Sequence, residues 1–232
     1  MWPYFFIDYW YIVLVLPVMI ISIIIQGVMR STYKKYSNVY AGAGVTGAEM
    51  AQRVLSEHGV TDVAVAATGG ELTDHYDPKR KVIMLSQDVY HGKSVSALGV
   101  ACHEAGHAVQ HAQSYLPLMA RNSFVPVVNF CSGISWFVLI IGIFMQSDLM
   151  INLGIILFAT AAIFQFITLP VEFNASRRAV ASLRNSGRLS EEEIAGTKKV
   201  LTAAAMTYVA ALAASLASLL RLILITRGNR RR

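Results

Sequence analysis

The sequence predicts an α-helical membrane protein with about four transmembrane helices and a small α+β soluble part. Hydrophobic residues make up 55% of its 232 residues, and the mean hydropathy is +0.49. These residues are not spread evenly, as they would be in a large soluble core, but gather in four long stretches. A helix needs about 20 consecutive, mostly apolar residues to cross a bilayer. Each stretch is therefore long enough to be a transmembrane helix.

The four apolar stretches cover residues 9–29, 124–145, 149–169 and 201–225. We expect the first to be a retained anchor rather than a cleaved signal peptide. No basic residue precedes it, whereas Arg30, Lys34 and Lys35 follow it. The fourth is rich in alanine, serine and threonine, which suit close packing between helices in lipid. A buried helix of the soluble part is the alternative interpretation of the fourth stretch.

The apolar stretches also predict the organisation of the chain. Only residues 146–148 separate the second stretch from the third, so these two form a hairpin that returns the chain to the side it left. The polar blocks before and after the hairpin therefore share one face of the membrane. We expect an N-terminal transmembrane anchor over 1–30, a soluble block over 31–121, a transmembrane hairpin over 122–170, a second polar block over 171–200, and an apolar helix with a basic tail over 201–232.

Charge predicts the orientation of the chain and limits its partners. The net charge of +6 comes mostly from lysine and arginine beside the apolar stretches, where they suit anionic lipid headgroups. Most of them lie in or next to the two polar blocks, so the positive-inside rule places both blocks in the cytoplasm. Four full crossings would then leave the basic residues of 227–232 outside, a conflict that disappears if the fourth stretch does not fully cross. The chain has no nucleic-acid motif, phosphate loop or repeat, so nucleic acid is not an expected partner.

Local patterns predict the elements of the soluble block. Thr46 and Glu49 form a capping box, which predicts that a helix starts there. Gly59 predicts where this helix ends. Asp74, Asp77 and Pro78 indicate a loop. The pairing of Cys102 with Cys131 is not expected, because Cys131 lies within an apolar stretch. The expected elements are a helix over 48–58, strands over 61–67 and 81–86, and a long helix that starts at Ser94 or Ser96.

Residues 103–107 read His-Glu-Ala-Gly-His, which is the H-E-x-x-H pattern. On a helix, His103 and His107 lie on one face, so both imidazoles can bind one metal ion. Glu104 is then placed as the general base of a metal-assisted hydrolysis of an amide bond, with zinc as the expected metal. A solvated polar helix face is the alternative. The apolar residues around the motif argue against it, because three buried ionisable groups without a metal would be costly.

A catalytic zinc ion needs a third protein ligand. His111 is too far along the helix, because eight residues after His103 correspond to about 12 Å. Glu172 is the better candidate, since Pro170 indicates a helix that begins there. A glutamate in the first turn of a helix is also favoured by the helix dipole alone, which is the simpler interpretation. Other oxygen or nitrogen donors are Asp74, His75, Asp77, Asp88 and His91.

Three segments together resemble the bacterial neutral zinc metallopeptidase family of membrane proteins, the YugP-like family. They are Leu-Thr-Asp-His-Tyr-Asp-Pro at 72–78, His-Glu-Ala-Gly-His-Ala-Val-Gln at 103–110 and Glu-Phe-Asn-Ala-Ser-Arg-Arg-Ala at 172–179. The resemblance covers nearly the whole chain. It implies a zinc-dependent metalloendopeptidase with a zincin-like soluble part, a multi-pass location in a bacterial cell membrane, and one Zn²⁺ per chain. The layout is also similar to gluzincin membrane proteases, which implies that Glu172 is the third ligand.

The resemblance also predicts a residue near the metal that differs in this chain. It leads us to expect an aspartate where this chain has Asn174, which can hydrogen-bond but carries no charge. A carboxylate there would raise the basicity of a ligating histidine. Candidates for stabilising the oxyanion are His75, Tyr76, Arg177 and Arg178.

A metal site close to the bilayer predicts peptide or membrane-protein substrates. The strand over 82–85 could pair with an extended substrate as an edge strand, or be an ordinary strand with no such role. The alternative function is a non-catalytic zinc-containing membrane scaffold, or a partner within a membrane protease complex. A fourth protein ligand such as His75 or Asp74 would favour the scaffold, whereas an open fourth position would favour the enzyme.

Overall fold

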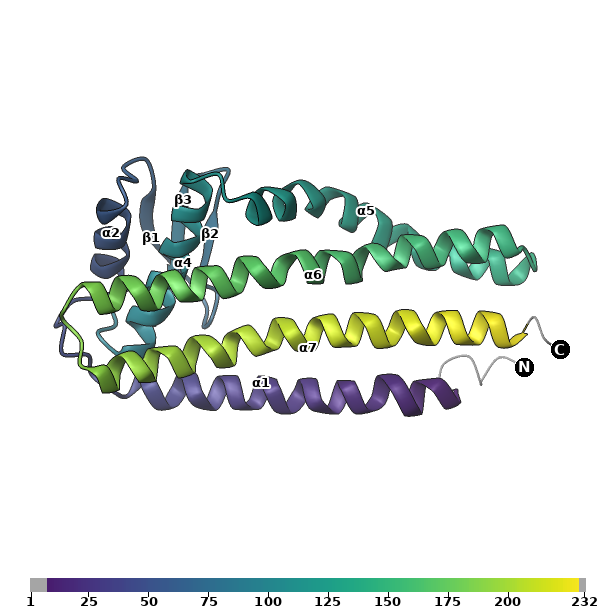
Figure 1. The fold of residues 1–232 in the computed structure, drawn as a ribbon, viewed down its shortest axis with the longest axis horizontal. Coiled ribbons are helices and arrows are strands. Elements are labelled where there is room, and N and C mark those ends of the chain that lie inside the picture. Colours follow the sequence, from purple (N-terminus) through teal and green to yellow (C-terminus); the bar gives the residue numbers. More distant parts are fainter. Residues whose placement is uncertain (1–7, 230–232) are drawn as a thin grey trace. The chain divides into compact units, whose positions relative to one another are not determined.

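The computed structural model describes residues 8–229, and their side chains as far as residue 226. This part of the chain is mostly helical and has four long apolar helices and a small sheet, which confirms the predicted fold class (Figure 1). The elements in chain order are a π-helical turn η2 (Tyr11–Val15), α1 (Leu16–Ser37), α2 (Gly47–Glu57), β1 (Ala64–Thr68), β2 (His75–Asp77), β3 (Val82–Ser86), α3 (Gln87–Tyr90), α4 (Val95–Ala112), α5 (Leu116–Phe144), α6 (Asp148–Asn185) and α7 (Glu191–Asn229).

The chain divides into two compact units. The apolar unit consists of Met1–Gln26, Ala120–Leu169 and Thr207–Arg232, and the mixed unit consists of Gly27–Met119 and Pro170–Met206. The mixed unit thus combines two segments that lie far apart in the sequence. All residues of the candidate site belong to it.

Four helices within residues 8–229 are long and apolar enough to cross a membrane. They are Tyr11–Ser37, Leu116–Phe144, Asp148–Asn185 and Glu191–Thr226. Each covers all or nearly all of one predicted apolar stretch and extends beyond it at one end or both. The difference arises because hydropathy marks the part of a helix that suits lipid, whereas backbone hydrogen bonds continue the same helix into polar sequence.

The α5–α6 hairpin of the apolar unit is closed by a tight turn. Gln146 has a φ of 50°, and the amide of Ser147 donates to the carbonyl of Gly142 over 2.9 Å. The helices pack closely, because a Cβ atom on Gly154 would lie 2.5 Å from Cγ of Leu139. The close approach of the two backbones is the kind of packing that small residues allow in lipid.

An ion pair joins the first and last helices of the apolar unit. The carboxylate of Asp8 accepts from Nη2 of Arg221 at 2.6 Å and from Nε at 2.8 Å. The guanidinium also lies 5.2 Å from the ring centre of Tyr11. Asp8 precedes the first helix and Arg221 lies late in α7, so the start of the first helix lies beside the C-terminal part of α7. This contact fits a fourth helix that runs the full length of the bundle.

The strands of the mixed unit form a three-stranded sheet in the order β1-β3-β2. β1 runs parallel to β3, and β2 runs antiparallel to it, with His75 opposite Met84. β3 is therefore the central strand, and the hypothesis that 82–85 is an edge strand for substrate is wrong. β2 lies in a segment predicted to be a loop. Three residues are too few for an alternating pattern, so this strand is defined only by its pairing with β3.

The predicted start and stop signals of α2 are confirmed. The hydroxyl of Thr46 accepts from the amide of Glu49 at 3.2 Å, and the Glu49 carboxylate accepts from the amide of Thr46 at 2.8 Å. Gly59 follows the helix with a φ of +69°. Of the two serines considered for the start of α4, Ser94 is the N-cap, accepting from the amide of Ala97 at 3.2 Å.

The core of the mixed unit surrounds α4. It joins Leu55 of α2 and Ile83 of β3 with Leu183 of α6 and Ile194 of α7. Cys102 of α4 lies in the same core, and burial raises the pKa of its thiol. Cys102 and Cys131 are both free and buried. α4 is thus held on several sides, which gives its histidines a rigid support.

Pro170 does not begin a helix, so that prediction is wrong. It lies inside α6, which continues from Asp148 to Asn185. Proline removes one backbone donor, but helices that pass through lipid tolerate this loss where side chains and neighbouring helices satisfy the freed groups. Glu172 therefore stands on a helix that continues directly from the apolar hairpin.

Candidate metal centre

α4 presents His103 and His107 on one face of the helix. Their rings lie 4.7 Å apart between centres and are nearly perpendicular, at 84°. The side chains are 15% and 10% exposed, so both are largely shielded from solvent but can still be reached. This placement follows directly from the four-residue spacing in a helix that the core holds in place.

α6 brings Glu172 against both histidines. Its Oε2 atom lies 3.3 Å from Nε2 of His103 and 3.6 Å from Nε2 of His107. Glu172 is only 2% exposed. One ligand atom from each of the three residues can be chosen so that all lie within 4.8 Å of one another. The structure thus brings together the three residues that the sequence indicated as candidate ligands.

The arrangement of these donors fits a zinc ion. Zinc bonds to histidine nitrogen and carboxylate oxygen are about 2.0–2.1 Å long, and tetrahedral geometry then places ligand atoms about 3.3–3.4 Å apart. The two measured nitrogen–oxygen distances, 3.3 Å and 3.6 Å, are close to this spacing. Two histidines and one carboxylate are also a donor set of catalytic zinc sites, which use three protein ligands.

The charges around His107 suit the exchange of a proton for a metal ion. Burial disfavours the charged imidazolium, but the hydrogen bond and charge of Glu172, together with the charge of Glu104, outweigh it. The pKa of His107 therefore lies above its ordinary value in the metal-free protein. A metal ion bound by His107 and Glu172 would take the place of that proton. Glu104 is itself buried and follows His103 directly in α4.

Each ligating histidine candidate has a partner at its other ring nitrogen. Nδ1 of His103 lies 3.2 Å from the hydroxyl of Ser176, and Nδ1 of His107 lies 3.0 Å from Oε1 of Gln110. Neither partner was identified from the sequence as a functional residue. For Gln110 the available signal was its position three residues after His107, on the same side of the helix. Ser176 shares the face of α6 that carries Glu172.

Asn174 does not contact a histidine itself but contacts Gln110, which contacts His107. Its Oδ1 atom accepts from Nε2 of Gln110 at 2.9 Å and from Nε of Arg178 at 2.8 Å. An aspartate would accept the same two bonds, so asparagine preserves the acceptor and loses only the charge. Arg178 is therefore hydrogen-bonded to Asn174, and its Nη1 atom also donates to Gln113 at 2.8 Å.

The other candidate residues lie in different surroundings. His75 is exposed, with its Nδ1 atom 2.8 Å from the carbonyl of Thr73. The hydroxyl of Tyr76 lies 2.8 Å from Nδ1 of His111, one helical turn after His107. Arg177 is exposed. None of these contacts joins the three-residue group, so an oxyanion role for these side chains stays a prediction.

The acidic residues considered as alternative ligands have local roles. The carboxylate of Asp74 accepts from the amide of Ser86 at 2.8 Å and from its hydroxyl at 3.1 Å, and burial raises the pKa of Asp74. Asp77 accepts from the amides of Lys79 and Arg80 and so stabilises a turn. Asp88 lies in the first turn of α3, and the ring of His91 packs edge-on against that of Tyr90.

The glycine of the motif allows α4 and α6 to approach each other. A Cβ atom on Gly106 would lie 3.0 Å from the carbonyl oxygen of Ala175 and 3.4 Å from its Cα atom. Any side chain at position 106 would therefore push against the backbone of α6. The small residue brings Glu172, one turn before Ala175, within reach of the histidines.

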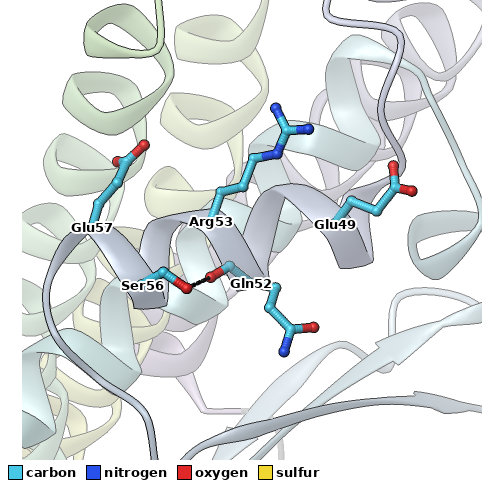
Figure 2. Close-up of a pocket in the computed structure, with 5 residues that line it drawn as sticks. All are labelled: Glu49, Gln52, Arg53, Ser56 and Glu57. Carbon is cyan, nitrogen blue, oxygen red and sulfur yellow. Dashed lines mark hydrogen bonds between the residues drawn. The ribbon is translucent and has the colours of Figure 1, made fainter.

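A hollow elsewhere on the mixed unit lies over one face of α2. It is lined by Glu49, Gln52, Arg53, Ser56 and Glu57 (Figure 2). The hydroxyl of Ser56 donates to the carbonyl of Gln52 at 2.9 Å, and Glu49 belongs to the capping box. These contacts are those of an ordinary polar helix face, so the hollow adds nothing to the metal centre.

Comparison with known proteins agrees with this geometry. A family model described as "Putative neutral zinc metallopeptidase" matches residues 11–227. The chain belongs to this family. It is also 50% identical over 202 residues to the "Putative membrane protease YugP" of Bacillus subtilis (strain 168), covering 87% of this chain and 90% of that protein. No solved structure matches the chain. The resemblance inferred from the three sequence segments is thereby confirmed, and the family description implies zinc.

Proposed function

We propose that this protein is a membrane-bound zinc metalloendopeptidase of the gluzincin type, with His103, His107 and Glu172 as the ligands of one zinc ion. The observation that carries the proposal is the convergence of the two Nε2 atoms and the Oε2 atom at distances of 3.3 Å and 3.6 Å. A set of three donors supports an enzyme over a zinc-containing scaffold, because closed structural sites use four protein ligands.

The chemistry divides between the metal and Glu104. Zinc, when bound, polarises the scissile carbonyl and increases the acidity of a water molecule. The Glu104 carboxylate accepts a proton from the attacking water and passes it to the leaving amine. Because Glu104 is buried and follows His103 directly in α4, its carboxylate is held by the same helix as two of the ligands. The reaction is the hydrolysis of a peptide bond.

We further propose that the two polar blocks, 31–121 and 171–200, form the catalytic part and face the cytoplasm of a bacterial cell. Lysine and arginine beside these blocks support this orientation under the positive-inside rule. The contact of Asp8 with Arg221 supports a complete fourth crossing, which places the two chain ends on the opposite side. Glu172 follows the apolar hairpin in one helix, so membrane proteins and their juxtamembrane segments are the proposed substrates.

Comparing the membrane proteomes of cells that produce the wild-type protein or the Glu104→Gln variant tests this function. We expect new peptide termini that depend on Glu104 and that map to cytoplasmic segments close to transmembrane helices. Termini that map to the external side would contradict the orientation. Identical sets of termini in the two cell lines, at equal protein levels, would contradict the peptidase function in the cell.

A further inference from the structure

We infer that Gln110 is a positioning residue that accepts a hydrogen bond from Nδ1 of His107 and so holds the ring with Nε2 as the atom left to bind zinc. The inference rests on the proposed zinc site, and it concerns residues that the family description does not mention. Gln110 lies in α4 and Asn174 in α6, so the hydrogen bond between them links the two helices that carry the proposed ligands.

The side chain of Gln110 is completely buried and makes three hydrogen-bonding contacts. Its Nε2 atom donates to the carbonyl of Val171 at 2.9 Å and to Oδ1 of Asn174 at 2.9 Å. Its Oε1 atom lies 3.0 Å from Nδ1 of His107. Val171 directly precedes Glu172. The Gln110 amide therefore contacts the proposed ligand His107 and also the backbone beside the proposed ligand Glu172.

The donor and acceptor of each hydrogen bond in this network follow from the groups that can only accept or only donate. A backbone carbonyl can only accept, so the Val171 carbonyl requires the nitrogen of the Gln110 amide to face it. The amide oxygen then faces His107, and an oxygen without hydrogen can only accept. Nδ1 of His107 must therefore carry a hydrogen, so the neutral ring that binds a metal ion has its lone pair on Nε2. That atom is the one 3.6 Å from Oε2 of Glu172.

Asn174 and Arg178 hold the other end of the network. A guanidinium always donates, so Nε of Arg178, at 2.8 Å, requires Oδ1 rather than Nδ2 of Asn174 to face it. The same Oδ1 atom accepts from Gln110. Turning either amide over would place a donor against a donor or an acceptor against an acceptor in a buried site, which is costly.

This polarity explains why a neutral residue is sufficient at position 174. The Asn174 side chain needs only an oxygen acceptor to orient Gln110, and both asparagine and aspartate provide one. The role differs from that of a carboxylate bonded directly to a ligand, which would change the charge of the site. Gln110 orients the ring without adding charge.

The test uses full-length protein in detergent and the variants Gln110→Leu, Asn174→Leu and Asn174→Asp, with Ser96→Ala as the matched control. Ser96 is also completely buried in α4, but its hydroxyl contacts the hydroxyl of Ser94 rather than a proposed ligand. For each protein, zinc affinity is measured by competition with a chelator, the visible spectrum is recorded with Co²⁺ in place of zinc, and thermal unfolding is followed without metal. The cobalt spectrum reports ligand geometry, which general destabilisation does not alter.

We expect Gln110→Leu to weaken zinc binding by about 10- to 100-fold, the usual effect of losing a partner of a metal ligand, and to change the cobalt spectrum. Asn174→Leu should also weaken zinc binding and change the cobalt spectrum. Zinc affinity and cobalt spectrum should stay near those of the wild type in Asn174→Asp and should not change in Ser96→Ala.

Wild-type affinity and spectrum in Gln110→Leu would overturn the inference. If Gln110→Leu does not fold, equal affinities of Asn174→Leu and Asn174→Asp would overturn it. Wild-type protein that binds no zinc would instead overturn the proposed function itself.

Discussion

Replacing Glu104 by glutamine is expected to abolish peptide cleavage while zinc stays bound. Glutamine has nearly the same shape as glutamate but cannot accept a proton, so the attacking water loses its general base. Loss of such a base lowers turnover by on the order of 100- to 10,000-fold. Zinc content should not change, because the proposed ligands are His103, His107 and Glu172. The measurement is turnover of a fluorogenic peptide together with metal analysis of the same sample.

Glu57→Gln is the control for this substitution. Glu57 is an exposed residue at the end of α2, so its loss of charge should affect neither zinc nor turnover. Cleavage that is undiminished in Glu104→Gln would refute the role of Glu104 as the base. Loss of both zinc and cleavage would refute the proposed separation between metal binding by the histidines and proton transfer by Glu104.

The Glu172→Ala substitution is expected to reduce zinc affinity by more than about 100-fold, beyond the range seen when only a partner of a ligand is lost. Glu172 supplies the only oxygen donor of the three-residue group. Its Oε2 atom lies close to both histidine Nε2 atoms, so no remaining donor of the group can replace it. Cleavage should fall together with the bound zinc.

Glu57→Ala serves as the matched control, since it removes a glutamate of the mixed unit that lies outside the site. Competition with a chelator gives the affinities, and thermal unfolding of the metal-free proteins shows whether each variant folds. A folded Glu172→Ala variant that retains one zinc ion at wild-type affinity would reject Glu172 as a ligand. It would direct attention to Asp74 or His75 instead.

Features set by local sequence could be predicted well. The capping box of Thr46 and Glu49 depends on residues three apart, and it is present as predicted. The apolar stretches indicated long helices because lipid imposes a length and a composition on any helix that crosses it. The spacing of His103 and His107 requires only a helix. The candidate role of Glu172 followed from a resemblance and from a hairpin that returns the chain to the same side.

Features set by distant contacts could not be predicted. The short strand β2 exists only through its pairing with β3, and the central position of β3 depends on that pairing. Pro170 on its own indicated the start of a helix, but α6 continues through it. The contact of Gln110 with Asn174 depends on how closely α4 and α6 approach each other. Gly106 allows this close approach, but the position of a glycine in the sequence does not show which helix it will pack against.

Metal removal and restoration in the purified wild-type protein tests the proposed zinc peptidase most directly. Zinc is removed with a chelator, and peptide cleavage is measured before removal, after removal and during titration with Zn²⁺. We predict that cleavage is lost with the metal and returns in full when one zinc ion per chain has been added. Cleavage that persists in protein shown to contain no metal would contradict the proposed mechanism, as would a folded protein that takes up no zinc.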